Sequence, residues 1–193
     1  MLDTLKDWLG TYWKILLVPT PKTFMAESRK ADGKTASAVV WLLFYAAYLC
    51  IMANILIGPS SFIGVVSVVV LVPLAVFLLA SLMHFAYQWI SHRKNYVYDQ
   101  LLYLTVAILL PLEFVFVPVA LVLPGPFGPV LAFIVLLYQV GLLVIALASV
   151  AKIEIWEALI SVFIGIIGTV LASIIVALLI YATMANPGVS RSH

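Results

Sequence analysis

The sequence is poor in charge and in cysteine. Only 9% of its 193 residues are charged and 65% are hydrophobic, whereas soluble domains have about 25% charged and about 45–50% apolar residues. A water-soluble fold of this length could not bury so much apolar surface, so the composition predicts an integral membrane protein. Cys50 is the single cysteine, which excludes a disulfide within the chain and a cysteine-ligated zinc site.

Catalytic motifs are also missing from the sequence. It has no phosphate-binding glycine loop, no GxSxG, no HExxH and no paired carboxylates within one loop. Its net charge of +2 is small, so a nucleic-acid partner is not expected. We therefore expect a protein that is not an enzyme and that binds no cofactor or metal.

Five apolar stretches are each long enough to cross a bilayer as a helix, which takes about 20 residues. They cover residues 38–57, 62–90, 100–123, 130–150 and 158–185. The segments between them, "GPSS", "SHRKNYVYD", "PGPFGP" and "AKIEIWE", are short and mostly polar or rich in Gly and Pro, so neighbouring helices should run antiparallel. We expect an all-α polytopic membrane protein with a five-transmembrane-helix bundle as one domain.

Residues 1–37 are predicted to be cytoplasmic and to form an amphipathic interfacial helix followed by a basic linker. Apolar residues recur in residues 1–17 at helical spacings of three and four: Leu2, Leu5, Leu9, Tyr12, Trp13 and Leu16. Such a helix suits the membrane surface, and packing on the protein's own bundle is the alternative. The linker sequence "ESRKADGK" (residues 27–34) can attract anionic lipid headgroups and also fix the topology.

The basic residues predict the orientation of the chain. With five spans and a cytoplasmic N-terminus, nine of the ten Lys and Arg lie in the cytoplasm, as the positive-inside rule requires. Arg191, in a short extracytoplasmic tail of residues 186–193, is the exception. The cytoplasmic set consists of Lys6, Lys14, Lys22, Arg29, Lys30, Lys34, Arg93, Lys94 and Lys152.

Three segments carry a resemblance to a known family: "LLVPTPKTFMAESRK", "YDQLLYLTVAILLPLEFVFVPVALV" and "LLYQVGLLVIALASVAKIEIWEALISVFIG". Over residues 12–185, their order is similar to that of the Yip-domain family, five-span membrane proteins named in eukaryotes for interaction with Ypt/Rab GTPases. The resemblance implies a cytosolic N-terminus and no catalytic residues. The short N-terminus resembles that of prokaryotic members, which implies a location in a prokaryotic plasma membrane.

Glu113 is an acid inside the third apolar stretch, between Pro111 and Pro118. Because a helix rises about 1.5 Å per residue, residues of three other spans are expected at its depth, with Cys50 on the first span at the same level. The predicted intramembrane polar layer consists of Glu113, Tyr138, Gln139, Thr169 and Ser173. Its role is open between a proton or cation relay, hydrogen bonds that hold the helices together, and contact with another subunit.

Small residues recur at every fourth position of the fifth stretch. They are Ser161, Gly165, Thr169, Ser173 and Ala177. Such a ridge lets another helix approach closely. We expect this helix-packing ridge to face either the bundle or a second copy of the chain.

A polar seam is predicted on the second stretch, where Ser81, His84 and Gln88 share one helix face. One reading of this face is a metal or proton site. His84 and Gln88 cannot hold a metal by themselves, because no further His, Asp or Glu lies within a turn. The other reading is a hydrogen-bonded seam between helices.

Together these features predict a non-catalytic membrane scaffold or adaptor of the Yip-domain type. Its expected partners are membrane lipids and other integral membrane proteins, with a second copy of the chain as a further candidate. One alternative is a small proton- or cation-coupled transporter or channel that uses the layer around Glu113. Another is a membrane-shaping or lipid-binding protein, which the amphipathic N-terminus and the basic linker favour.

Overall fold

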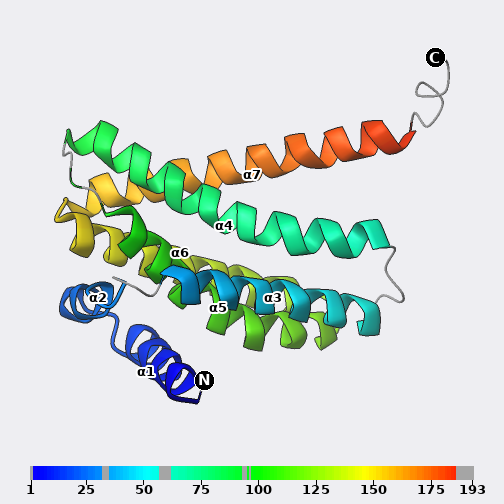
Figure 1. Cartoon of the computed structure of the whole chain (residues 1–193), viewed down its shortest axis with the longest axis horizontal. Coiled ribbons are helices and arrows are strands. Elements are labelled where there is room, and N and C mark those ends of the chain that lie inside the picture. Colours follow the sequence, from blue (N-terminus) through cyan, green and yellow to red (C-terminus); the bar gives the residue numbers. More distant parts are fainter. Residues whose placement is uncertain (1, 32–34, 57–61, 93–94, 96, 186–193) are drawn as a thin grey trace.

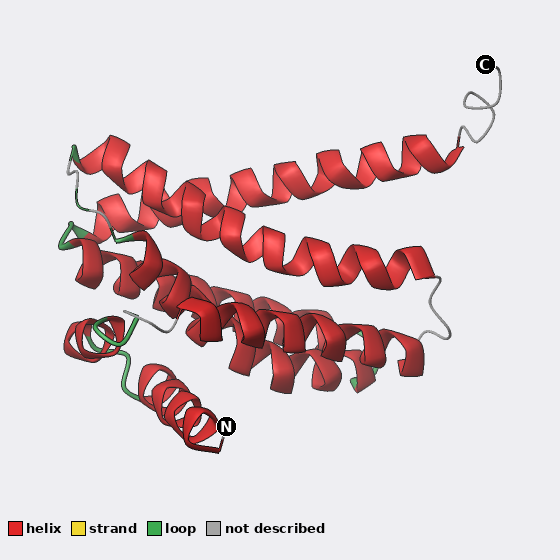
Figure 2. Ribbon diagram, in the orientation of Figure 1, coloured by secondary structure: helices red, strands yellow, loops and turns green. Residues whose placement is uncertain are grey.

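The computed structural model describes residues 2–31, 35–56, 62–92, 95 and 97–185. Within these residues the chain is all-α and forms seven helices (Figures 1 and 2). They are α1 (Leu2–Leu17), α2 (Pro21–Ser28), α3 (Thr35–Leu56), α4 (Phe62–Ser91), α5 (Tyr98–Val122), α6 (Phe127–Ala151) and α7 (Ile155–Ala185). The predicted tail with Arg191, and the predicted cytoplasmic residues Lys34, Arg93 and Lys94, lie outside the described residues.

The helices α3 to α7 are long, and each runs opposite to the one before it (Figure 1). Four of them contain apolar segments long enough to cross a membrane: Val69–Ser91, Tyr98–Ala120, Phe127–Ala151 and Ile155–Leu179. The fifth, α3, contains a shorter apolar segment, Ala36–Met52. All five helices begin and end within three residues of the stretches predicted from the sequence.

Helix α5 lies at the centre of the packing and α7 at its edge. Half of the apolar segment of α5 is buried (50%), and the run from Leu101 to Ile108 is continuously buried. In α7 the corresponding share is 11%. The main neighbour of α7 is α4, and the two helices diverge toward the C-terminal end of α7 (Figure 1). Much of α7 is therefore left without a helix of this chain beside it.

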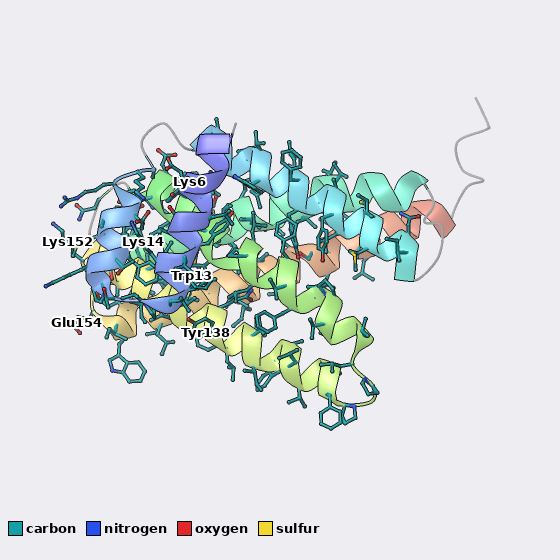
Figure 3. All side chains as sticks on the ribbon, turned by 90° about the horizontal axis from the view of Figure 1, so that it is seen from below. Lys6, Trp13, Lys14, Tyr138, Lys152 and Glu154 are labelled. Carbon is teal, nitrogen blue, oxygen red and sulfur yellow. The ribbon has the colours of Figure 1, made fainter. Side chains whose placement is uncertain are left out.

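The first helix lies crosswise to the long helices (Figure 3). Trp8 and Ile15 of α1 are buried against the bundle, and the Trp8 indole donates a 2.7 Å hydrogen bond to the Ser37 hydroxyl of α3. A second apolar face of α1 is exposed: Leu9, Trp13 and Leu17. Helix α1 thus combines packing on its own protein with an uncovered apolar stripe of the kind that enters a membrane interface.

The segment predicted as a basic linker contains a second helix, α2. Its N-cap is Thr20, whose hydroxyl accepts a 3.2 Å hydrogen bond from the Thr23 amide, and Pro21 follows in the first turn. Both features favour a helix start, because the threonine satisfies a free amide and proline has none to satisfy. Helix α2 packs on α5 and α6 at one end of the bundle.

Candidate functional site

Glu113 is the centre of a hydrogen-bonded cluster that joins three helices. Its Oε1 accepts a 3.0 Å hydrogen bond from Nε2 of Gln139 on α6. Its Oε2 accepts a 3.4 Å hydrogen bond from the Tyr45 hydroxyl on α3. Gln139 is buried, with 3% of its surface exposed. Both carboxyl oxygens of Glu113 therefore point toward partners within the chain, and the cluster crosslinks α3, α5 and α6.

Next to this cluster, Tyr48 compensates for a proline. Pro118 of α5 has no amide to donate, so the carbonyl of Phe114 loses its helical partner. The Tyr48 hydroxyl of α3 donates to that carbonyl at 3.1 Å. The rings of Tyr45 and Tyr48 also pack on the Phe114 ring, with centroids 5.2 and 4.7 Å away. A side chain from α3 thus fills the gap that Pro118 leaves in the hydrogen bonds of α5.

The structure places three of the five predicted layer residues away from Glu113. The Tyr138 hydroxyl donates to the Leu16 carbonyl at the end of α1, at 2.5 Å. The Thr169 hydroxyl donates to the Gly165 carbonyl of its own helix at 2.8 Å, and Ser173 is exposed. Adjacent residues of a helix point about 100° apart, so Tyr138 cannot face Glu113 once Gln139 does. Glu113 does contact the predicted Gln139, and its second partner is Tyr45, which residue counting along the spans did not identify.

The missed residues share a reason. Counting residues along the first span pointed to Cys50 at the level of Glu113, whereas Tyr45 supplies the contact from one turn further toward the N-terminus. Residue counting compares backbone positions, whereas the long side chains of Tyr45 and Glu113 meet at a distance from their backbones, so a difference of about one turn is bridged. The spacing of Tyr45 and Tyr48 by three residues, which puts two hydroxyls on one face of α3, was the available signal.

The predicted ridge packs along only part of its length. Ser161 is fully buried, and Gly165 lies against Met83 and Leu79 of α4, so closely that an added Cβ would come within 2.6 Å of Met83 Cγ. Farther along, Ser173 and Ala177 are exposed, because α4 and α7 diverge there (Figure 1). The first half of the ridge is therefore a packing face within the chain, and the second half is open.

The three residues of the predicted seam face the start of α5. Ser81 Oγ lies 3.5 Å from the Tyr98 hydroxyl, and the His84 ring packs edge-on against the Tyr98 ring, with centroids 6.0 Å apart. The Gln88 amide donates to the Asn95 carbonyl at 3.4 Å. Among the described residues, no group of three or more His, Cys, Asp or Glu is placed to hold a metal ion. The seam fastens α4 to the residues that precede and begin α5.

A second buried acid, Glu27, fastens α1 and α2 to the bundle. Its carboxylate, 2% exposed, accepts a 2.9 Å hydrogen bond from the Thr11 hydroxyl and lies 2.5 Å from Lys30 Nζ and 3.6 Å from Lys14 Nζ. The Thr11 hydroxyl also lies 3.4 Å from the Tyr103 hydroxyl of α5. This cluster was not predicted, because Glu27 belongs to the run ESRKADGK, whose basic residues indicate an exposed linker.

The charges around Glu27 decide its protonation. Burial alone would raise the pKa of its carboxyl group, but the hydrogen bonds from Lys30 and Thr11 and the charges of Lys30 and Lys14 outweigh burial and hold the pKa below its usual range. Glu27 is therefore ionised near neutral pH and works as an anionic anchor for two helices.

Burial beside Tyr103 raises the pKa of a second group in this region, the Tyr12 hydroxyl of α1.

Comparison with known proteins gives no assignment. No family model, no curated protein and no solved structure matches the chain.

Proposed function

We propose that this protein is a non-catalytic integral membrane scaffold or adaptor of the Yip-domain type, which binds other integral membrane proteins. In this proposal α3 to α7 cross the membrane as five spans, with the N-terminus in the cytoplasm of a prokaryotic cell and the C-terminus outside. The arrangement of the cations supports this orientation, because Lys14 and Lys152 lie at the same end of the bundle (Figure 3).

The open half of α7 is the observation that carries the proposal. Beyond its contact with α4, this helix exposes apolar side chains around its circumference: Ile167, Val170, Leu171, Ile174, Ile175, Leu178 and Leu179. In lipid, helices associate through close packing rather than through the hydrophobic effect, and small residues make that packing possible. Ser173 and Ala177 are exposed on this same part of α7, so a partner helix can approach it closely.

The wedge between the diverging helices fits such a partner. A hollow of about 80 Å³ lies between α4 and α7 and is lined by Leu74, Ala75 and Leu78 on one side and by Ala172 and Ser173 on the other. Because alanine and serine have small side chains, another helix can approach the backbones of both α4 and α7 closely at this hollow. We infer that this wedge is where a membrane partner docks.

The contacts of Glu113 favour a structural over a transport role. Its hydrogen-bond partners are Gln139 and Tyr45. A relay needs a chain of ionisable groups, whereas these contacts hold helices together. The proposal therefore expects that Glu113→Gln changes assembly rather than the flux of an ion.

Paired tryptophan variants test the docking wedge. Ser173→Trp fills it, and Leu137→Trp puts a tryptophan at an exposed position on α6 as a control. The protein is extracted in lipid nanodiscs, and the companions that purify with it are identified and quantified by mass spectrometry. We expect a stoichiometric membrane-protein companion that Ser173→Trp removes and Leu137→Trp retains. A companion-free monomer, or equal loss in both variants, contradicts the proposal.

A further inference from the structure

We infer that the hollow between α2, α5 and α6 at the cytoplasmic end is a binding site for a phosphate group. This hollow measures about 320 Å³, which is within the range of about 300–1,000 Å³ found for small-ligand sites. It opens where α2 ends, α5 begins and α6 ends. The site is separate from the wedge at α7, so it does not depend on the scaffold function.

Two cations line the hollow, and they come from different helices. Arg29 is the C-cap residue of α2, and Lys152 is the C-cap residue of α6. Figure 3 shows Lys152 beside α2 at this end of the bundle. Two cations from separate elements on one hollow can bind the same anion from two sides, and arginine in particular matches the geometry of phosphate oxygens.

Neighbouring lysines pair with Glu27, whereas Arg29 lines the hollow. One residue away, Lys30 pairs with Glu27, and Lys14 pairs with the same carboxylate. Arg29 has no carboxylate within ion-pair distance in the described part of the chain. None of the described residues that line the hollow is Asp or Glu. The described side chains that line the hollow therefore include two cations and no anion, which favours an anionic ligand.

Neutral donors complete the lining. Asn95 and Gln100 are among the residues that line the hollow, and a side-chain amide can donate two hydrogen bonds to phosphate oxygens. The Asn95 backbone is held by the Tyr87 hydroxyl and the Gln88 amide, which both donate to its carbonyl. The polar seam of α4 thus positions one wall of the site. Because the hollow lies where α5 begins and α6 ends, the proposed topology puts it at the membrane surface, so the phosphate comes either from a lipid or from a soluble phosphate ester.

Three single substitutions separate a built site from diffuse attraction. Arg29→Gln and Lys152→Gly each remove a cation from the hollow, and Lys22→Gln removes one from an exposed position of α2 outside it. Lys152 has a left-handed backbone with φ of 56°, which glycine adopts without strain. Lys152→Gly therefore removes the cation without adding backbone strain, and the unfolding temperature of each variant is measured beside its binding to separate a lost contact from misfolding.

The full-length protein in phosphatidylcholine nanodiscs is the sample for two binding measurements. One titrates soluble glycerol 3-phosphate by calorimetry, and the other counts retained phosphatidic acid by native mass spectrometry after that lipid is added to the nanodiscs. We expect Arg29→Gln and Lys152→Gly to weaken binding by about tenfold or more, as for hydrogen bonds to a charged group. Lys22→Gln should weaken it by about fivefold or less, as for a surface cation.

The two arms identify the source of the phosphate. Binding in the lipid arm alone assigns a lipid headgroup, binding in the soluble arm alone assigns a free phosphate ester, and binding in both assigns the phosphate group itself. The inference is overturned if neither arm shows binding. It is equally overturned if Lys22→Gln weakens binding as much as Arg29→Gln, because that result describes a diffuse basic surface.

Discussion

Replacing Gln139 by leucine removes the 3.0 Å hydrogen bond that Glu113 receives from α6. The Glu113 carboxyl group then keeps only the Tyr45 hydroxyl at 3.4 Å, a distance longer than the 2.5–3.0 Å of ordinary O–H···O bonds. Interhelical hydrogen bonds in membranes contribute about 0.6 kcal/mol on average and at most about 1.7. A buried polar group left without a partner costs a further 1–3 kcal/mol, roughly. We expect Gln139→Leu to lower the free energy of unfolding by about 2 kcal/mol.

The double variant distinguishes a lost contact from a damaged core. Glu113→Leu alone leaves the Gln139 amide without its partner and should also cost about 2 kcal/mol. When both residues become leucine, no unpaired amide or carboxyl group remains, and only the Tyr45 hydroxyl loses its partner. The double variant should then cost less than the sum of the two single ones, with a coupling of about 2 kcal/mol.

The assay is reversible unfolding in mixed micelles by titration with a denaturing detergent, followed by tryptophan fluorescence from the five tryptophans of the chain. Thr169→Val is the matched control, because Thr169 lies in the predicted layer but bonds to its own helix at Gly165. It should show no coupling to Glu113→Leu. Additive costs for Gln139→Leu and Glu113→Leu would refute the assignment of these residues as partners.

Three further predictions follow from other contacts. The pKa of Glu27 is lowered, so its stabilisation of α1 and α2 is complete above the ordinary glutamate pKa of about 4.3 and is lost as the pH falls through the lower folded value. Proteolysis of α1 should therefore increase in acid, whereas in Glu27→Gln it should be high already at pH 7 and independent of pH. Tyr48→Phe leaves the Phe114 carbonyl without its 3.1 Å donor and should lower the unfolding free energy by about 1 kcal/mol, and an unchanged value in the same assay would contradict the role of Tyr48. Gly165→Leu should separate α4 from α7 and cost about 1–3 kcal/mol, whereas Ser173→Leu, at an exposed position of the same ridge, should be nearly neutral; equal costs would show that the whole ridge is packed.

The long helices were predictable because their signals are local. A run of apolar residues and a following Gly/Pro or polar break determine where each of α3 to α7 begins and ends, without knowledge of any partner. Helix α2 was less visible because it is short and only moderately apolar, so its start depends on the cap at Thr20 rather than on hydrophobic periodicity.

The polar contacts were only partly predictable because they depend on helix rotation. Depth along a span follows from residue counting, and Gln139 was found in this way. Which side of α6 faces Glu113 depends on packing with α5, and a rotation by one residue exchanges Gln139 for Tyr138. The environment of Glu27 was not predictable, because its partner Thr11 belongs to a different helix that docks on the bundle.

The docking of α1 sets an order for the assembly of the chain. Two of the groups that contact it come much later in the sequence: Tyr103 is 92 residues after Thr11, and Tyr138 is 122 residues after Leu16. At a synthesis rate of about 5–20 residues per second, these two contact residues are synthesised roughly 5 to 24 s after their partners in α1. During this delay α1 can bind the bilayer surface through its exposed apolar stripe of Leu9, Trp13 and Leu17. A nascent chain stopped before Tyr138 would lack the last of these contacts, so α1, although synthesised before the five long helices, completes its packing only after most of them have been made.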